Sequence, residues 1–156
     1  MTTEDHKALV RRYFEEAPRN PDVCGEILAP RILVHTLQHA SVTPQTVESS
    51  PESEQAAYRW LASVWSPGRR MTINEMIAEG DRVVVCWTFH GIHQGEFYGL
   101  PPTLRAVTYS GINIFRIEGG RIAEIWDMAD RLWLWQQLGV LPDLKDAIAR
   151  AGGEER

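Results

Sequence analysis

The sequence predicts one α+β domain, in which N-terminal helices pack on one face of a curved antiparallel sheet of four or more strands. In the first 65 residues, apolar side chains recur at helical spacing. From residue 71 to residue 128 they recur at every second position, and glycine-containing turn signals separate the runs. Helices followed by an antiparallel meander are typical of α+β proteins. The 156 residues suit one domain with one core.

Three helices are expected in the first half. The second of them fits residues 21–28, with Pro21 at its first position. The third begins near Ser50 and ends before Pro67. The first ends at Pro18, and its helical spacing is carried by Leu9, Val10, Tyr13, Phe14 and Ala17.

Two segments between these helices have no helical period. Residues 32–34 could form a short strand or an extended lead into a loop. Residues 38–53 are rich in Ser, Thr, Pro and Gln, and we expect them to form a long loop. Long loops in compact domains are often lids or binding loops.

Four strands are expected in the second half, over residues 71–77, 82–90, 107–117 and 121–128. Gly80-Asp81 and Gly119-Gly120 predict tight turns within the first and last pairs of strands. Residues 132–138 are expected to form a short helix or turn that closes the domain. We therefore expect the domain to span residues 1–148 and residues 149–156 to form a frayed tail.

Charge and composition exclude several classes of partner. The formal net charge is −5 and no basic face is evident, which argues against nucleic acid. No apolar run reaches membrane-spanning length, and the polar, acidic N-terminus does not resemble a secretion signal. We therefore expect a cytoplasmic protein with no membrane partner. Cys24 and Cys86 lack Cys-x-x-Cys spacing and are expected to be reduced thiols.

An acid in the last strand is the main candidate for chemistry. Side chains two apart on a strand share a face, so Asp127 lies with Ala123 and Ile125. A carboxyl group that is buried without a partner is costly and has a raised pKa, which suits proton transfer. Alternatively, Asp127 could be an exposed acid at the strand end or pair with Arg116 or Arg131.

Two nearby polar residues bear on this assignment. Asp130 competes with Asp127 as the functional acid, but it could instead cap a helix that begins near Arg131. The turn at Gly119-Gly120 places Asn113 across from residues 125–127 on the neighbouring strand. Its amide could orient a carboxylate or donate to an enolate, or it could be satisfied by backbone groups.

Histidine and tryptophan residues offer further candidates. His93, in a glycine-bounded loop, could donate to a ligand oxygen or organise the loop. The spacings His90-x-x-His93 and His35-x3-His39 do not fall on an evident helix, so no metal site is expected. The tryptophans could line a pocket for a flat aromatic ligand or belong to the core or a dimer interface; they are Trp60, Trp65, Trp87, Trp126, Trp133 and Trp135.

Several segments together resemble the SnoaL-like polyketide cyclase family of the nuclear-transport-factor-like superfamily. They include Gly91-Ile-His-Gln-Gly, Gly111-Ile-Asn-Ile-Phe and Gly120-Arg-Ile-Ala-Glu-Ile-Trp-Asp, and the resemblance covers residues 71–139. It implies a cone of curved sheet and helices around a deep pocket. It also implies ring closure of a hydrophobic polyketide-like substrate by intramolecular aldol condensation, with no metal and no cofactor. A homodimer is a further expectation from the family.

The resemblance also implies a set of site residues. The family's catalytic aspartate aligns with Asp127, and its loop histidine with His93. Its second histidine falls on Asn113, so this chain departs from the family there. We expect these three residues to be catalytic and the following to bind substrate: His35, Trp87, Phe97, Phe115, Trp126 and Asp130. Isomerisation, dehydration or epoxide opening in the same pocket, or binding without chemistry, are the alternatives.

Overall fold

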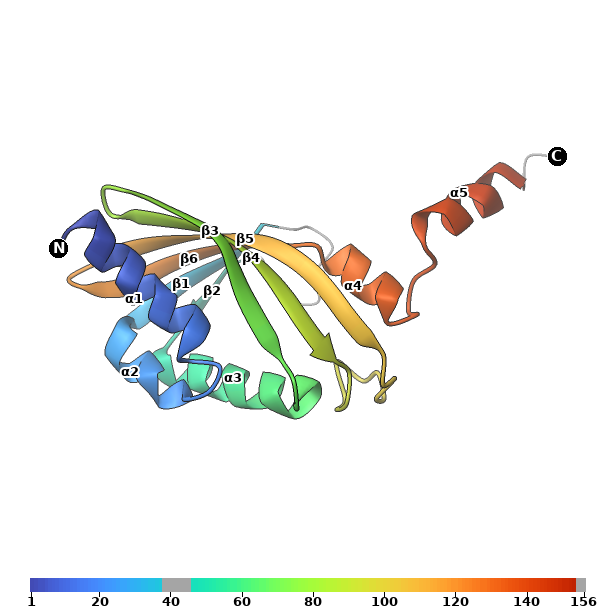
Figure 1. The fold of residues 1–156 in the computed structure, drawn as a ribbon, viewed down its shortest axis with the longest axis horizontal. Helices are drawn as coiled ribbons and strands as arrows, with labels where there is room; N and C mark the ends of the chain where they lie inside the picture. Colours follow the sequence, from blue (N-terminus) through green and yellow to red (C-terminus); the bar gives the residue numbers. More distant parts are fainter. Residues whose placement is uncertain (38–45, 154–156) are drawn as a thin grey trace.

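A six-stranded sheet with helices on one face forms the body of the molecule (Figure 1). The computed structural model describes residues 1–37 and 46–153. The strands are β1 (Leu28–Thr36), β2 (Thr46–Ser49), β3 (Arg70–Glu79), β4 (Arg82–Ile92), β5 (Ala106–Glu118) and β6 (Arg121–Ala129). The helices are α1 (Thr3–Glu15), the short 3-10 helix η1 (Pro21–Val23), α2 (Cys24–Ile27), α3 (Pro51–Trp65), α4 (Arg131–Gln137) and α5 (Leu144–Gly153). The predicted α+β class is confirmed.

The sheet is mixed, whereas the sequence predicted an antiparallel one. Its strand order is β2-β1-β6-β5-β4-β3, and β3 to β6 form the predicted antiparallel meander. β1 lies parallel to β6, and β2 pairs antiparallel with β1 at the edge of the sheet. β2 lies within the segment 38–53 that was expected to be a loop. The strand was not predicted because its short, mostly polar sequence has no apolar period. Residues 38–45 of that loop lie outside the described part.

Helices α1, α2 and α3 cover the inner face of the sheet (Figure 1). Thr2 and Asp5 form a capping box at the start of α1, and the Ser50 side chain caps α3. Alternate residues of β4 point into the core between sheet and helices, as the period of two predicted. This apolar core includes Val83, Val85, Trp65, Val64, Phe14 and Phe115.

The chain continues past the expected domain end as a helix. α5 covers residues that were expected to belong to a frayed tail, and none of its side chains is buried. It extends away from the sheet (Figure 1). Residues 154–156 are outside the described part. No helix within residues 1–37 or 46–153 is long and apolar enough to cross a membrane.

Because Gly111 has no side chain, the Trp87 indole can pack directly against its backbone. The two residues are directly opposite each other in β5 and β4. A Cβ atom on Gly111 would overlap the Trp87 ring and lie 2.7 Å from the Met128 carbonyl oxygen. The position of the Trp87 indole on the inner face therefore depends on a glycine at position 111.

We predict that Gly111→Ala lowers the free energy of unfolding by about 1–3 kcal/mol, the usual cost of overpacking. Urea denaturation measures this loss. Gly152→Ala in α5 is the control, because a Cβ there meets no atom within 4 Å. It should leave stability unchanged or raise it slightly, since alanine favours helix. Equal stability of Gly111→Ala and the parent protein would contradict the steric argument.

Candidate active site

A cavity of about 330 Å³ opens between the inner face of the sheet and helices α1 and α3. Most of its wall is apolar or aromatic: Tyr13, Phe14, Pro18, Val34, Val47, Ala57, Tyr58, Leu61, Met71, Trp87, Phe89, Tyr109 and Ile125. The polar and charged wall residues are Thr36, Glu54, Arg69, Asn113, Asp127 and Arg131. A largely apolar cavity with a few converging polar groups is the usual form of a small-molecule site.

Asp127 lies on the cavity wall, and its carboxylate is paired. It sits on the inner face of β6 with its side chain 16% exposed. Arg131 Nη2 donates to its Oδ2 atom at 2.6 Å from the first turn of α4. Asp127 thus lies on the inner face of β6, as its strand position predicts, and its carboxylate has an arginine partner, which was the alternative prediction.

Asn113 lies directly opposite Asp127, which confirms the register predicted from the hairpin turn. The Trp87 indole N–H donates to Asn113 Oδ1. Because an indole N–H can only donate, the amide oxygen must face Trp87 and the amide nitrogen must face the acid. Asn113 Nδ2 accordingly lies 3.4 Å from Asp127 Oδ1. Asn113 therefore orients the carboxylate.

Glu54 is a second carboxyl group on the cavity wall. Burial raises its pKa above the ordinary value, against hydrogen bonds from Ser49 and Tyr13 that lower it. Ser49 Oγ donates to Glu54 Oε1 at 2.8 Å. Among the residues that the structure describes, no Lys, Arg or His lies within 4 Å of this carboxyl group. Glu54 was not predicted from the sequence, because an acid in the first turn of a helix is ordinary.

Tyr109 brings a hydroxyl group to the same wall. Burial raises the pKa of Tyr109 to about 12, and the charges of Arg131, Asp127 and Arg69 all act on it. The hydroxyl therefore stays protonated at neutral pH and can donate a hydrogen bond into the cavity.

The family model of SnoaL-like polyketide cyclases matches residues 8–138. The chain belongs to this family. The matched segment contains Asp127, Arg131 and every other residue of the cavity wall. None of the curated proteins is significantly similar to the chain.

Several solved structures share the fold. TsrD from Streptomyces laurentii is 29% identical with a TM-score of 0.74, and the match covers 90% of this chain and 99% of that one. IdmH, a putative polyketide cyclase from Streptomyces antibioticus, is 25% identical with a TM-score of 0.71, over 86% and 99%. A putative SnoaL-like polyketide cyclase from Jannaschia is 24% identical with a TM-score of 0.76, over 90% and 95%.

His93, which the family resemblance assigned to catalysis, does not line the cavity. It is fully buried, with its ring 5.4 Å from that of Trp65. The Thr103 backbone N–H donates to His93 Nδ1 at 3.1 Å, so in the neutral ring the proton is on Nε2. Burial lowers the pKa of His93, against a hydrogen bond with Gly95 that raises it. The His93 ring thus joins the two ends of the loop between His93 and Thr103, which was the alternative prediction.

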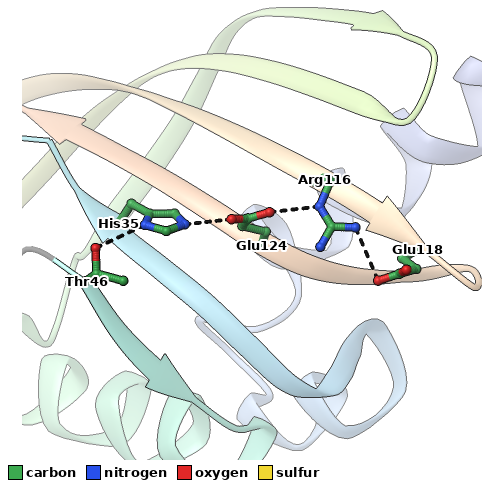
Figure 2. Close-up of polar contacts among 5 residues, drawn as sticks. All are labelled: His35, Thr46, Arg116, Glu118 and Glu124. Carbon is green, nitrogen blue, oxygen red and sulfur yellow. Dashed lines mark hydrogen bonds and ion pairs between the residues drawn. The ribbon is translucent and has the colours of Figure 1, made fainter.

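His35 and Trp126 lie on the outer face of the sheet, away from the cavity. Their rings are stacked, with 5.1 Å between the ring centroids. Figure 2 shows His35 between Thr46 and Glu124, with His35 Nε2 2.7 Å from Glu124 Oε1. Arg116 Nε donates to the other oxygen of Glu124 at 2.8 Å. These residues join β1, β5 and β6 and do not meet the cavity wall.

The remaining expected site residues divide between cavity and core. Trp87 lines the cavity, whereas Phe97 and Phe115 do not. Phe115 is fully buried against Phe14, and Phe97 stacks on Trp60 and on Trp135.

Asp130 caps α4, as the alternative interpretation predicted. Its Oδ1 accepts from the Trp133 backbone N–H at 3.1 Å, and its side chain is not part of the cavity wall. Among the described residues, no group of three His, Cys, Asp or Glu side chains could hold a metal ion.

We predict that Glu54→Gln stabilises the protein more at neutral pH than in acid. Above the ordinary value of 4.5, an unfolded Glu54 releases its proton while the folded one retains it. The free energy of unfolding of the parent protein therefore falls as pH rises through this window, and glutamine removes that loss. Urea denaturation across this pH range measures the difference.

Glu52→Gln is the matched control in the same helix turn. Hydrogen bonds from its own backbone and from Ser50 lower the pKa of this exposed carboxyl group. Its contribution to stability is present above the ordinary value and is lost as pH falls, so glutamine there should have the opposite pH trend. Parallel curves for the Glu54 variant and the parent would contradict the assignment.

Proposed function

We propose that this protein is a cofactor-independent cyclase that closes a ring in a polyketide-like carbonyl substrate, with Asp127 as the acid/base. The observation that carries the proposal is the Asp127 carboxylate on the wall of an apolar cavity, held by Arg131 and Asn113. Membership of the SnoaL-like polyketide cyclase family supports the reaction class.

The proposed reaction moves one proton out and one back. Asp127 takes a proton from a carbon between two carbonyl groups, and the electron pair of that C–H bond becomes an enolate. The enolate carbon attacks a second carbonyl group of the same molecule and forms the new C–C bond. The resulting alkoxide takes the proton back from Asp127, so the carboxylate is restored.

The rest of the cavity wall would position the substrate. Folding a flexible chain so that its two reacting carbons touch removes much of the entropic barrier. The Tyr109 hydroxyl can donate to the enolate oxygen, where charge develops. Asn113 acts through Asp127, because its amide oxygen is already occupied by Trp87.

The cavity wall also indicates the kind of substrate. We infer a hydrophobic small-molecule substrate, in keeping with the apolar and aromatic wall. A cytoplasmic homodimer that binds neither nucleic acid nor a membrane remains our expectation. Gel filtration with light scattering measures the oligomeric state directly.

We predict that Asp127→Asn lowers protein-catalysed exchange of an acidic carbon proton by about 100-fold or more, the usual contribution of a general base. The probe is 2-tetralone in D2O, a bicyclic ketone whose loss of the C1 proton signal is followed by NMR. The variant should keep its fold, because asparagine can still accept from Arg131.

Asp130→Asn is the matched control. This acid is three residues away but lies outside the cavity wall, and asparagine also caps helices well. It should exchange at the rate of the parent protein. If Asp127→Asn exchanges as fast as the parent, Asp127 is not the base. If the parent binds the ketone without exchanging it, the cavity is a binding module.

A further inference from the structure

A second arginine on the cavity wall has no acidic partner. Arg69 lies between the end of α3 and the start of β3 and is partly buried. Its Nη2 donates to the Pro18 carbonyl oxygen at 2.8 Å. Among residues 1–37 and 46–153 no carboxylate lies within 4 Å of its guanidinium, whereas Arg131 has Asp127 at 2.6 Å. A guanidinium carries five N–H groups, so donors remain for a ligand.

Burial makes this cation costly where it stands. Burial lowers the pKa of Arg69 below its ordinary value, and the hydroxyl groups of Tyr58 and Tyr109 partly offset this. The group stays charged at neutral pH, because arginine does not lose its proton in that range. A partly buried cation without a counterion is stabilised by an anion that enters the cavity.

Tyr109 adds a second donor to the wall that carries Arg69. Both residues line the cavity, and the charge of Arg69 acts to lower the pKa of the Tyr109 hydroxyl against the larger effect of burial. The Tyr58 hydroxyl is already committed, since it donates to the Tyr13 carbonyl oxygen at 3.1 Å. No described residue accepts a hydrogen bond from the Tyr109 hydroxyl. A cation and a neutral O–H on the wall of one cavity offer donors for the two oxygens of a carboxylate.

The other charges of the wall do not fill this role. Asp127 and Arg131 neutralise each other. Glu54 is the remaining acid, and its carboxyl group is bound to Ser49 and is not within 4 Å of Arg69. A substrate anion at Arg69 therefore meets a positive charge that no protein group has cancelled.

We propose that Arg69 and Tyr109 form a carboxylate subsite, so that the substrate is an aromatic or polyketide-like keto acid rather than a neutral ketone. The proposal rests on the proposed function, in that it takes this cavity as the substrate pocket. The subsite anchors the acid group, and the reacting carbons are then held toward Asp127.

The test compares two probes of equal shape, 2-naphthoate and 2-naphthamide, titrated into the protein at neutral pH and followed by NMR. The parent protein should bind the carboxylate at least about tenfold more tightly than the amide, which corresponds to about 1.4 kcal/mol. Arg69→Met should reduce this ratio to about one. Arg69→Lys keeps the charge but loses the planar fork of N–H groups, so its preference should fall between those of the parent and Arg69→Met.

Arg70→Met is the matched control, because Arg70 is the exposed neighbour and does not line the cavity. Its ratio should equal that of the parent. A parent protein that binds both probes equally, or neither, overturns the proposal, and so does an unchanged ratio in Arg69→Met. A purely structural role of Arg69 at Pro18 would weaken both probes alike and leave the ratio intact, which also overturns it.

Asp127→Asn separates this proposal from the proposed function. It should retain the preference for the carboxylate while losing proton exchange. If exchange persists in Asp127→Asn but the preference still depends on Arg69, the cyclase mechanism fails and the carboxylate subsite stands. If Asp127→Asn loses exchange but neither the parent nor any variant discriminates between the probes, the cyclase mechanism stands and the carboxylate subsite fails.

Discussion

The ion pair between Asp127 and Arg131 is the constraint on which the site depends. A lone carboxylate on the inner face of a sheet would cost several kcal/mol, and an arginine at hydrogen-bond distance offsets most of that cost. Arg131 can reach it because α4 begins immediately after β6, and the Asp130 cap fixes where that helix starts. Asn113 then holds the second carboxylate oxygen, with its own orientation set by Trp87. Three strands and one helix thus converge on a single acid.

β6 also carries a paired carboxylate on its outer face. Glu124 points outward from β6; burial opposes its ionisation, but hydrogen bonds from Arg116 and His35 lower its pKa overall (Figure 2). Each face of β6 therefore carries a carboxylate with one arginine and one further donor. β6 is also joined to the β1 side of the sheet near both residues: His35 of β1 bonds Glu124 on the outer face, and the N–H of Leu37, just after β1, donates to the backbone carbonyl oxygen of Asp127 at 2.9 Å.

The period of two along a strand was the most reliable guide from sequence. It placed Asp127 inward, and the turn at Gly119-Gly120 placed Asn113 opposite it. The same rule puts Trp126 on the outer face, whereas Trp126 was expected at the site as one of the tryptophans that could line a pocket for a flat aromatic ligand. Arg69 and Glu54 could not be found this way, because their place on the wall depends on how α3 packs over the sheet. Nor could β2, whose pairing with β1 is set by backbone hydrogen bonds rather than by an apolar pattern.

The asparagine at position 113 limits which groups can move protons. An amide does not titrate, and Trp87 already fixes its orientation, so it cannot supply the second acid that a histidine there would provide. The hydroxyl of Tyr109 holds its proton until about pH 12. The carboxyl groups of Asp127 and Glu54 are what remains on the described wall, and their surroundings differ in kind. One is bound by an arginine, whereas burial without a cation raises the pKa of the other. Glu54 is therefore able to keep its proton to a higher pH than an ordinary glutamate, and its surroundings suit a different role from those of Asp127.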